Sequence, residues 1–153
     1  MIIKDPKTLN MVQDHIFADK AYWPDDDGTT FCNVATQDLL RQLGYGGFSS
    51  MSADMMYTKV QTSPEWLIKP IADAIELVQE GTIILGILPS TILGQSHGHV
   101  NTLTPGSPDF SGKWNCKTPL CMNLGRAGTC FRLKGENWAF QIMPSFYALV
   151  ATL

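Results

Sequence analysis

The sequence predicts an α+β fold in which helices occupy the first half of the chain and strands occupy the second. Apolar residues recur at helical spacing before Gly81, whereas β-rich apolar runs separated by short turns follow it. The connections between these later runs are too short for crossover helices, so we expect antiparallel neighbours. A length of 153 residues with 44% hydrophobic residues suits one core, and we expect a single domain spanning residues 1–153.

Two helices at the start of the chain have clear boundary signals. Asp5-Pro6 is typical of a helix start, with an N-cap residue followed by proline in the first turn, and it predicts a helix over residues 6–17. Residues 32–43 place apolar side chains on one face and precede Gly44, a residue typical of the position just after a helix. They therefore predict the second helix.

Two further helical segments are expected before Gly81. Ser52 is a suitable N-cap for a short helix that ends near Val60. The sequence Ser-Pro-Glu at residues 63–65 is typical of another helix start, and helical spacing continues over residues 71–80.

Six strand candidates follow, separated by turn-forming sequences rich in Gly, Pro, Asn and Ser. They are residues 82–88, 99–104, 119–124, 129–133, 138–143 and 146–152. We expect them to form an antiparallel sheet on which the N-terminal helices pack.

Composition excludes several classes of protein. Charged residues make up only 16% of the chain and the net charge is −3, which argues against disorder and against a basic nucleic-acid-binding surface. The longest stretch without Asp, Glu, Lys or Arg, from Gly81 to Pro108, contains prolines and histidines that argue against a membrane span. The N-terminal residues lack the apolar core of a secretory signal peptide. We therefore expect no nucleic-acid partner, no membrane insertion and no signal peptide.

Cys32 is the first candidate for chemistry. Thr29 or Thr30 is expected to cap the second helix, which places Cys32 in its first turn. A helix N-terminus and a nearby imidazolium both favour the thiolate, which is the nucleophilic form of cysteine. The alternative is that Cys32 is a small buried hydrophobic residue.

The chain has three histidines that could serve as the partner of this thiol. His15 lies within the first predicted helix and is expected to be structural or exposed. His97 and His99 lie where a loop meets a predicted strand, and His99 leads directly into that strand, which would hold its ring rigidly. We therefore favour His99 over His97.

The order of these features resembles that of the papain-like cysteine peptidases and amidases. A cysteine opens a helix, a β-rich run begins at Gly81, and Gly98-His99-Val100 opens a later strand. The resemblance is to the NlpC-type and CHAP-type peptidoglycan hydrolases, although Phe31-Cys32-Asn33 differs from the Asp-Cys-Ser usual in NlpC-type enzymes. It implies a papain-like fold in which N-terminal helices pack on a C-terminal antiparallel sheet.

The resemblance also implies roles for individual residues. Cys32 would attack an amide carbonyl as the thiolate, with His99 as its base and its own backbone N–H helping to hold the oxyanion. A third polar residue would orient the imidazole, and Asn123 is the first choice because it lies on the next strand candidate. Asn101 is a weaker choice because it shares a strand with His99. Tyr22 could line the oxyanion side or could be ordinary loop packing.

The implied function is a cysteine endopeptidase or amidase that cleaves amide bonds in peptidoglycan peptides, with no cofactor and no metal. Such a protein would be made in a bacterial or phage-infected cytoplasm and would act on the cell wall, in the periplasm or outside. Its partners would be the wall peptide and, if one exists, an inhibitor or immunity protein.

Several alternatives compete with this interpretation. The chain could be a non-catalytic binding or structural domain of the same fold, or a related enzyme that transfers the acyl group to an amine. His97, His99, Cys116 and Cys121 carry zinc-ligand atoms, although their spacing is not a standard structural one. Cys116 and Cys121 could instead form a disulfide in an oxidising compartment.

Overall fold

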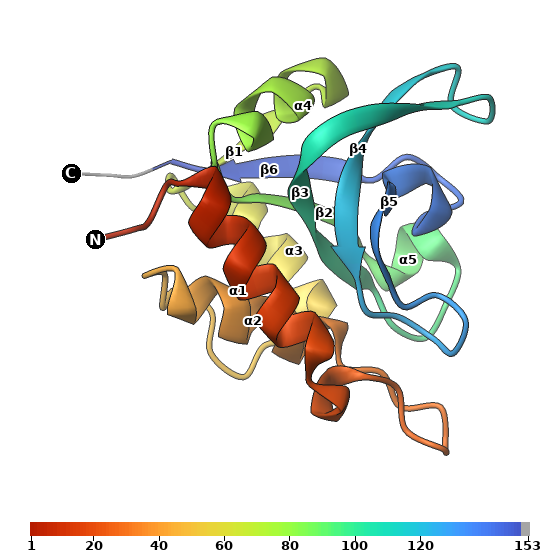
Figure 1. The fold of residues 1–153 in the computed structure, drawn as a ribbon. Helices are drawn as coiled ribbons and strands as arrows, with labels where there is room; N and C mark the ends of the chain where they lie inside the picture. The colour runs from red at the N-terminus through yellow and green to blue at the C-terminus, as the bar shows by residue number, and fades with distance from the viewer. Residues whose placement is uncertain (151–153) are drawn as a thin grey trace.

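The computed structural model describes residues 1–150, and it confirms the α+β class (Figure 1). The helices are α1 (Pro6–Ala18), α2 (Cys32–Gln42), α3 (Ala53–Thr62), α4 (Ile71–Gln79) and α5 (Ser90–Leu93), with short 3₁₀ helices η1 (Lys20–Tyr22) and η2 (Glu136–Trp138). The strands are β1 (Trp66–Lys69), β2 (Ile84–Leu88), β3 (His99–Ser111), β4 (Cys116–Asn123), β5 (Phe131–Gly135) and β6 (Ser145–Leu149). Within residues 1–150, no helix has both the length and the apolar character needed to cross a membrane.

The strands form one antiparallel sheet in the order β1-β6-β2-β3-β4-β5. Strand β2 is buried along its whole length between β6 and β3. Figure 1 shows α1, α2 and α3 gathered on one side, with α4 apart from them near β3 and β4. Leu39 and Leu40 of α2 are fully buried in the main core, which holds this helix against β3. The start of α2 is thereby fixed relative to the sheet.

The helices with capping signals lie where the sequence predicts them. The Asp5 carboxylate accepts the backbone N–H of Thr8 at 2.8 Å and caps α1. The Ser52 hydroxyl accepts the backbone N–H of Met55 at 3.1 Å and caps α3. These local hydrogen bonds replace partners that the first turn of a helix lacks, which is why such boundaries can be predicted from sequence.

The predicted helix start at residues 63–65 is wrong. Trp66 begins the edge strand β1, and α4 begins only at Ile71. The Trp66 side chain is 3% exposed, stacks on Phe48 and meets the ring of Tyr45 edge-on. Burial of this large aromatic surface outweighs a weak local helix signal.

The predicted strand at residues 138–143 is also wrong. Residues 136–138 form η2, in which Glu136 is buried and Trp138 is 66% exposed. An irregular turn then leads to β6. The predicted last strand over residues 146–152 corresponds to β6, and residues 151–152 lie outside the described part of the chain.

Strand β3 is longer than the sequence predicts. It continues past Pro105 to Ser111, because its register against β4 shifts between Thr104 and Asp109. The irregular pairing accommodates a proline, which lacks the N–H that a regular ladder needs.

Candidate active site

Cys32 is the first residue of α2, as predicted, but the helix is capped differently. Phe31 occupies the N-cap position and makes no side-chain hydrogen bond, so the prediction that Thr29 or Thr30 caps the helix is wrong. Thr29 belongs to the preceding loop, where its backbone N–H donates to the carboxylate of Asp27 at 2.9 Å. The start of α2 therefore keeps N–H groups without a side-chain cap beside the Cys32 sulfur.

The Cys32 thiol lies against His99, at the first position of β3. Cys32 is 6% exposed, and burial by itself would raise the pKa of its thiol. The charge and hydrogen bond of His99, together with the backbone N–H groups of Val100 and Asn33, outweigh burial and lower this pKa below its ordinary value. An imidazolium and two backbone donors are the surroundings that favour a thiolate.

The imidazole of His99 responds in the opposite direction. Burial by itself would lower its pKa, but the Cys32 thiolate, the hydrogen bond of Asn123 and the negative charge of Glu136 raise it. A lowered thiol pKa beside a raised imidazole pKa favours a thiolate–imidazolium ion pair. This is the activated state of a nucleophilic cysteine.

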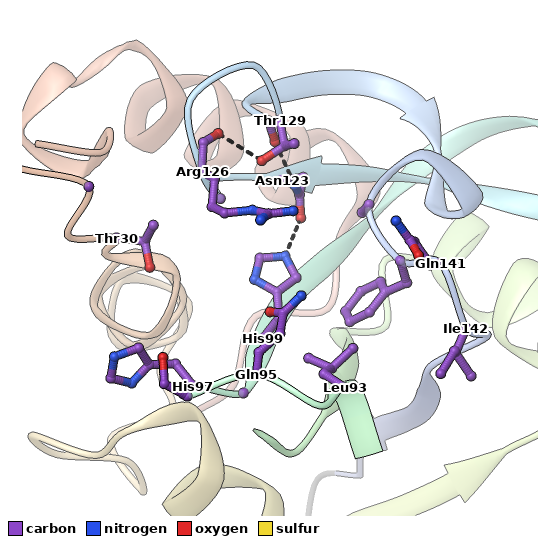
Figure 2. Close-up of a pocket in the computed structure, with 16 residues that line it drawn as sticks. Thr30, Leu93, Gln95, His97, His99, Asn123, Arg126, Thr129, Gln141 and Ile142 are labelled. Atoms are coloured by element: carbon purple, nitrogen blue, oxygen red, sulfur yellow. Dashed lines mark hydrogen bonds between the residues drawn. The ribbon is translucent and has the colours of Figure 1, made fainter. Parts of the chain in front are cut away.

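Asn123, the last residue of β4, contacts the His99 ring. Its Oδ1 lies 2.7 Å from His99 Nε2, so the predicted contact is confirmed (Figure 2). The Asn123 Nδ2 donates to the backbone carbonyl of Thr129 at 2.6 Å. Because a carbonyl oxygen can only accept a hydrogen bond, this contact fixes which end of the Asn123 amide is NH₂ and which is oxygen. His99 Nε2 must therefore donate to Oδ1, and Nδ1 remains to exchange a proton with the Cys32 sulfur.

Asn101 supports Asn123 rather than contacting the imidazole. Its Nδ2 donates to Asn123 Oδ1 at 3.0 Å and to Glu136 Oε1 at 2.5 Å. Register places Asn101 opposite Asn123, because the next pair along is Thr102 with Met122. These side chains thus form one polar chain across β3, β4 and η2, which runs from the half-buried His99 to the fully buried Glu136.

Glu136 is the residue that the sequence analysis missed. Its side chain is fully buried, and burial raises its pKa to about 7, although the hydrogen bond from Asn101 and the positive charge of His99 lower it. It stands between Gly135 and Asn137, where the sequence is typical of an exposed turn. Nothing in that local pattern distinguishes a buried carboxylate from a solvated one.

Gly86 on β2 lacks a side chain where the side chains of Glu136 and Asn101 pack against the strand. A Cβ at this position would lie 2.1 Å from Glu136 Oε2 and 2.8 Å from Asn101 Oδ1. Both side chains are buried and hydrogen-bonded, so neither can swing into solvent to relieve the overlap.

We therefore expect Gly86→Ala to lower the free energy of unfolding by about 1–3 kcal/mol, the usual cost of overpacking a core. Urea denaturation measures the change. Gly112→Ala is the matched control, because nothing lies within 4 Å of a Cβ at that glycine. Equal stability of the two variants would contradict the described placement of Glu136.

A cavity of about 550 Å³ opens beside His99. His97, Gln95, Thr30, Arg126 and Gln141 contribute polar groups to its wall (Figure 2). Apolar groups come from Leu93, Phe140 and Ile142. No Asp or Glu is among the lining residues, although the chain as a whole is acidic. The cavity therefore suits a polar ligand that carries negative charge.

Other candidate residues lie outside this constellation. In Figure 2 the His97 ring lies apart from that of His99. The Tyr22 hydroxyl donates to Asp38 at 2.6 Å and Tyr22 does not line the cavity.

The cysteine alternatives do not fit the structure. Cys116 and Cys121 are both free, so the disulfide alternative is wrong. In the described part of the chain, no three metal-ligating side chains gather in one place.

Comparison of the sequence with known protein families and with curated proteins finds no match.

Proposed function

We propose that this protein is a cysteine hydrolase, an endopeptidase or amidase of the papain-like type, which cleaves amide bonds in peptidoglycan peptides. The observation that carries the proposal is the ordered contact of Cys32, His99 and Asn123. The Cys32 thiol at a helix N-terminus supplies a nucleophile, and His99 at the start of a strand supplies a base. The oriented amide of Asn123 holds the His99 ring. The three helices α1 to α3 precede the antiparallel sheet, and α2 packs against β3, which also supports the papain-like assignment.

The geometry supports a two-step reaction. The Cys32 thiolate adds to the amide carbonyl carbon, and backbone N–H groups at the start of α2 stabilise the oxyanion. As the C–N bond breaks, the His99 imidazolium gives its Nδ1 proton to the leaving amine. Neutral His99 then takes a proton from water, the resulting hydroxide attacks the thioester, and the Cys32 thiolate leaves. The product acid is released with Cys32 and His99 again as an ion pair.

The cavity supports the choice of substrate. Stem peptides of peptidoglycan carry free carboxylates, and the cavity wall holds Arg126 and His97 without an opposing Asp or Glu. Arg126 forms no ion pair within residues 1–150, so its guanidinium can pair with a substrate carboxylate. We place the reaction at the cell wall, after synthesis in a bacterial or phage-infected cytoplasm.

The test is mass spectrometry of purified peptidoglycan fragments after incubation with the protein. New fragments whose masses sum to that of the intact fragment plus one water support the proposal and identify the hydrolysed amide bond. Products extended by an added amine would instead indicate acyl transfer. Intact fragments, under conditions where the protein is folded, would contradict the proposal and favour a binding role.

Asn123→Ala is expected to lower kcat by about 10- to 100-fold, less than loss of the base, which is commonly worth about 10²–10⁴-fold. Asn123 touches the His99 ring and no reacting atom, so its removal loosens the imidazole without removing it. Steady-state kinetics on a fluorogenic wall peptide measures the change, and thermal unfolding confirms that the variant is folded. A kcat equal to that of the unsubstituted protein would refute the orienting role.

A further inference from the structure

Glu136 is a buried carboxylate without a basic partner. Its side chain is 0% exposed, and no Lys or Arg within residues 1–150 forms an ion pair with it. Asn101 donates to Oε1, while Oε2 has no hydrogen-bond partner. Burying an ionisable group with an unsatisfied atom is costly, and a native protein that does so needs a reason.

The hydrogen bonds of Glu136 lead to the imidazole of His99. One N–H of the Asn101 amide donates to the carboxylate, and the same amide group donates to Asn123 Oδ1. That oxygen accepts the N–H of His99 Nε2. Both amides are fixed in orientation, because their NH₂ groups face oxygens that accept. Two asparagines thus connect the carboxylate to the base.

We propose that Glu136 is a positioning residue for the Cys32–His99 pair, which fixes Asn123 through Asn101 and supplies negative charge that stabilises the imidazolium. The inference rests on the proposed function for the roles of Cys32 and His99. It deepens that function by assigning the source of charge behind a neutral orienting amide. An asparagine can orient a ring but adds no charge, whereas Glu136 adds a negative charge to that of the Cys32 thiolate.

Among the groups packed around Glu136, His99 is the one whose positive charge the carboxylate stabilises. On β2 its neighbour is Gly86, whose partner on β6 is the apolar Phe146. On β4 the titratable neighbour is Cys121, whose pKa is raised well above its ordinary value by burial and by the Glu136 charge. The Cys121 thiol therefore stays protonated, and it donates to the backbone carbonyl of Lys134 at 3.5 Å. Glu136 raises the pKa of His99, whereas it is not among the influences on Cys32.

The sign of the effect follows from these contacts. Burial raises the pKa of Glu136 to about 7, so the carboxylate is charged above that pH and neutral well below it. The charged form favours imidazolium, and with it the thiolate–imidazolium pair over the neutral pair. Loss of the charge should therefore lower the pKa of His99 by about one unit, at the small end of effects from nearby charges. The difference should appear above about pH 7.

The test is Glu136→Gln, which keeps the side-chain size and an oxygen that accepts from Asn101 but removes the charge. His99 is titrated by NMR in both proteins, and the rate of Cys32 alkylation by iodoacetamide is mapped by mass spectrometry at pH 8. We expect the His99 pKa to fall by about one unit and alkylation to slow by up to about tenfold. Glu76→Gln, at an exposed carboxylate on α4, should change neither quantity.

A folded Glu136→Gln protein with an unchanged His99 pKa would overturn the inference and leave Glu136 a structural residue. A second measurement needs no variant. In the unsubstituted protein, the His99 resonances should show an additional inflection where the Glu136 carboxyl carbon titrates. Independent titration of the two groups would also overturn the inference. Both readouts are independent of wall cleavage, so a protein inactive on peptidoglycan would refute the proposed function without deciding the role of Glu136.

Discussion

Replacing Cys32 by alanine is expected to abolish cleavage of wall peptides, with a loss of about 10³-fold or more in kcat. The sulfur is the only group in the site that can form the thioester, and the remaining oxyanion and binding contacts leave little catalysis. The substitution removes one buried atom at the helix start, so α2 should still form. Turnover of purified muropeptides measures the loss, and circular dichroism checks the fold.

Cys32→Ser is expected to be inactive as well, because His99 does not form a comparable ion pair with an alcohol. Cys116→Ala is the matched control, since this free cysteine lies at the opposite end of β4 from Asn123. It should retain full turnover. Turnover by Cys32→Ala at the rate of the unsubstituted protein would rule out Cys32 as the nucleophile.

Replacing His99 by alanine is expected to reduce turnover about as completely as loss of Cys32. Without the imidazolium, burial raises the thiol pKa, and the leaving amine has no proton donor. The double variant of Cys32 and His99 should be no worse than either single variant, because residues that act as one unit are not additive. The kinetics of the two single variants and the double variant test this together.

His97→Ala is the control for the loss of an imidazole from the same loop. Its ring lies on the cavity wall apart from His99, so its loss should weaken substrate binding and raise KM more than it lowers kcat. An inactive His97→Ala beside an active His99→Ala would reverse the assignment of the base.

Local sequence signals were sufficient where the relevant contacts are local. The caps at Asp5 and Ser52 lie within three residues of the groups they bind, and both helices begin as predicted. Trp66 shows the limit of such signals. Its packing against Phe48 and Tyr45 depends on chain segments about twenty residues away, and this contact makes an edge strand where the local pattern predicted a helix.

The same distinction applies to the candidate site. The contact of Asn123 with His99 could be predicted because a polar residue on the next strand can reach across an antiparallel pair. Glu136 could not be predicted, because its burial depends on the space left by Gly86 and on an amide from β3. A glycine in the middle of a strand is a signal of close approach, but it does not identify the group that approaches.

The most direct measurement of covalent catalysis is trapping of the acyl-enzyme. Peptidoglycan fragments are mixed with the protein, the reaction is quenched in acid within the first turnover, and the digested protein is analysed by mass spectrometry. We expect an added mass equal to the acyl part of the cleaved peptide, held as a thioester on the Cys32 peptide and absent in Cys32→Ala. Cleavage of the fragments by that variant, or an acyl group found on a residue other than Cys32, would contradict the proposed mechanism.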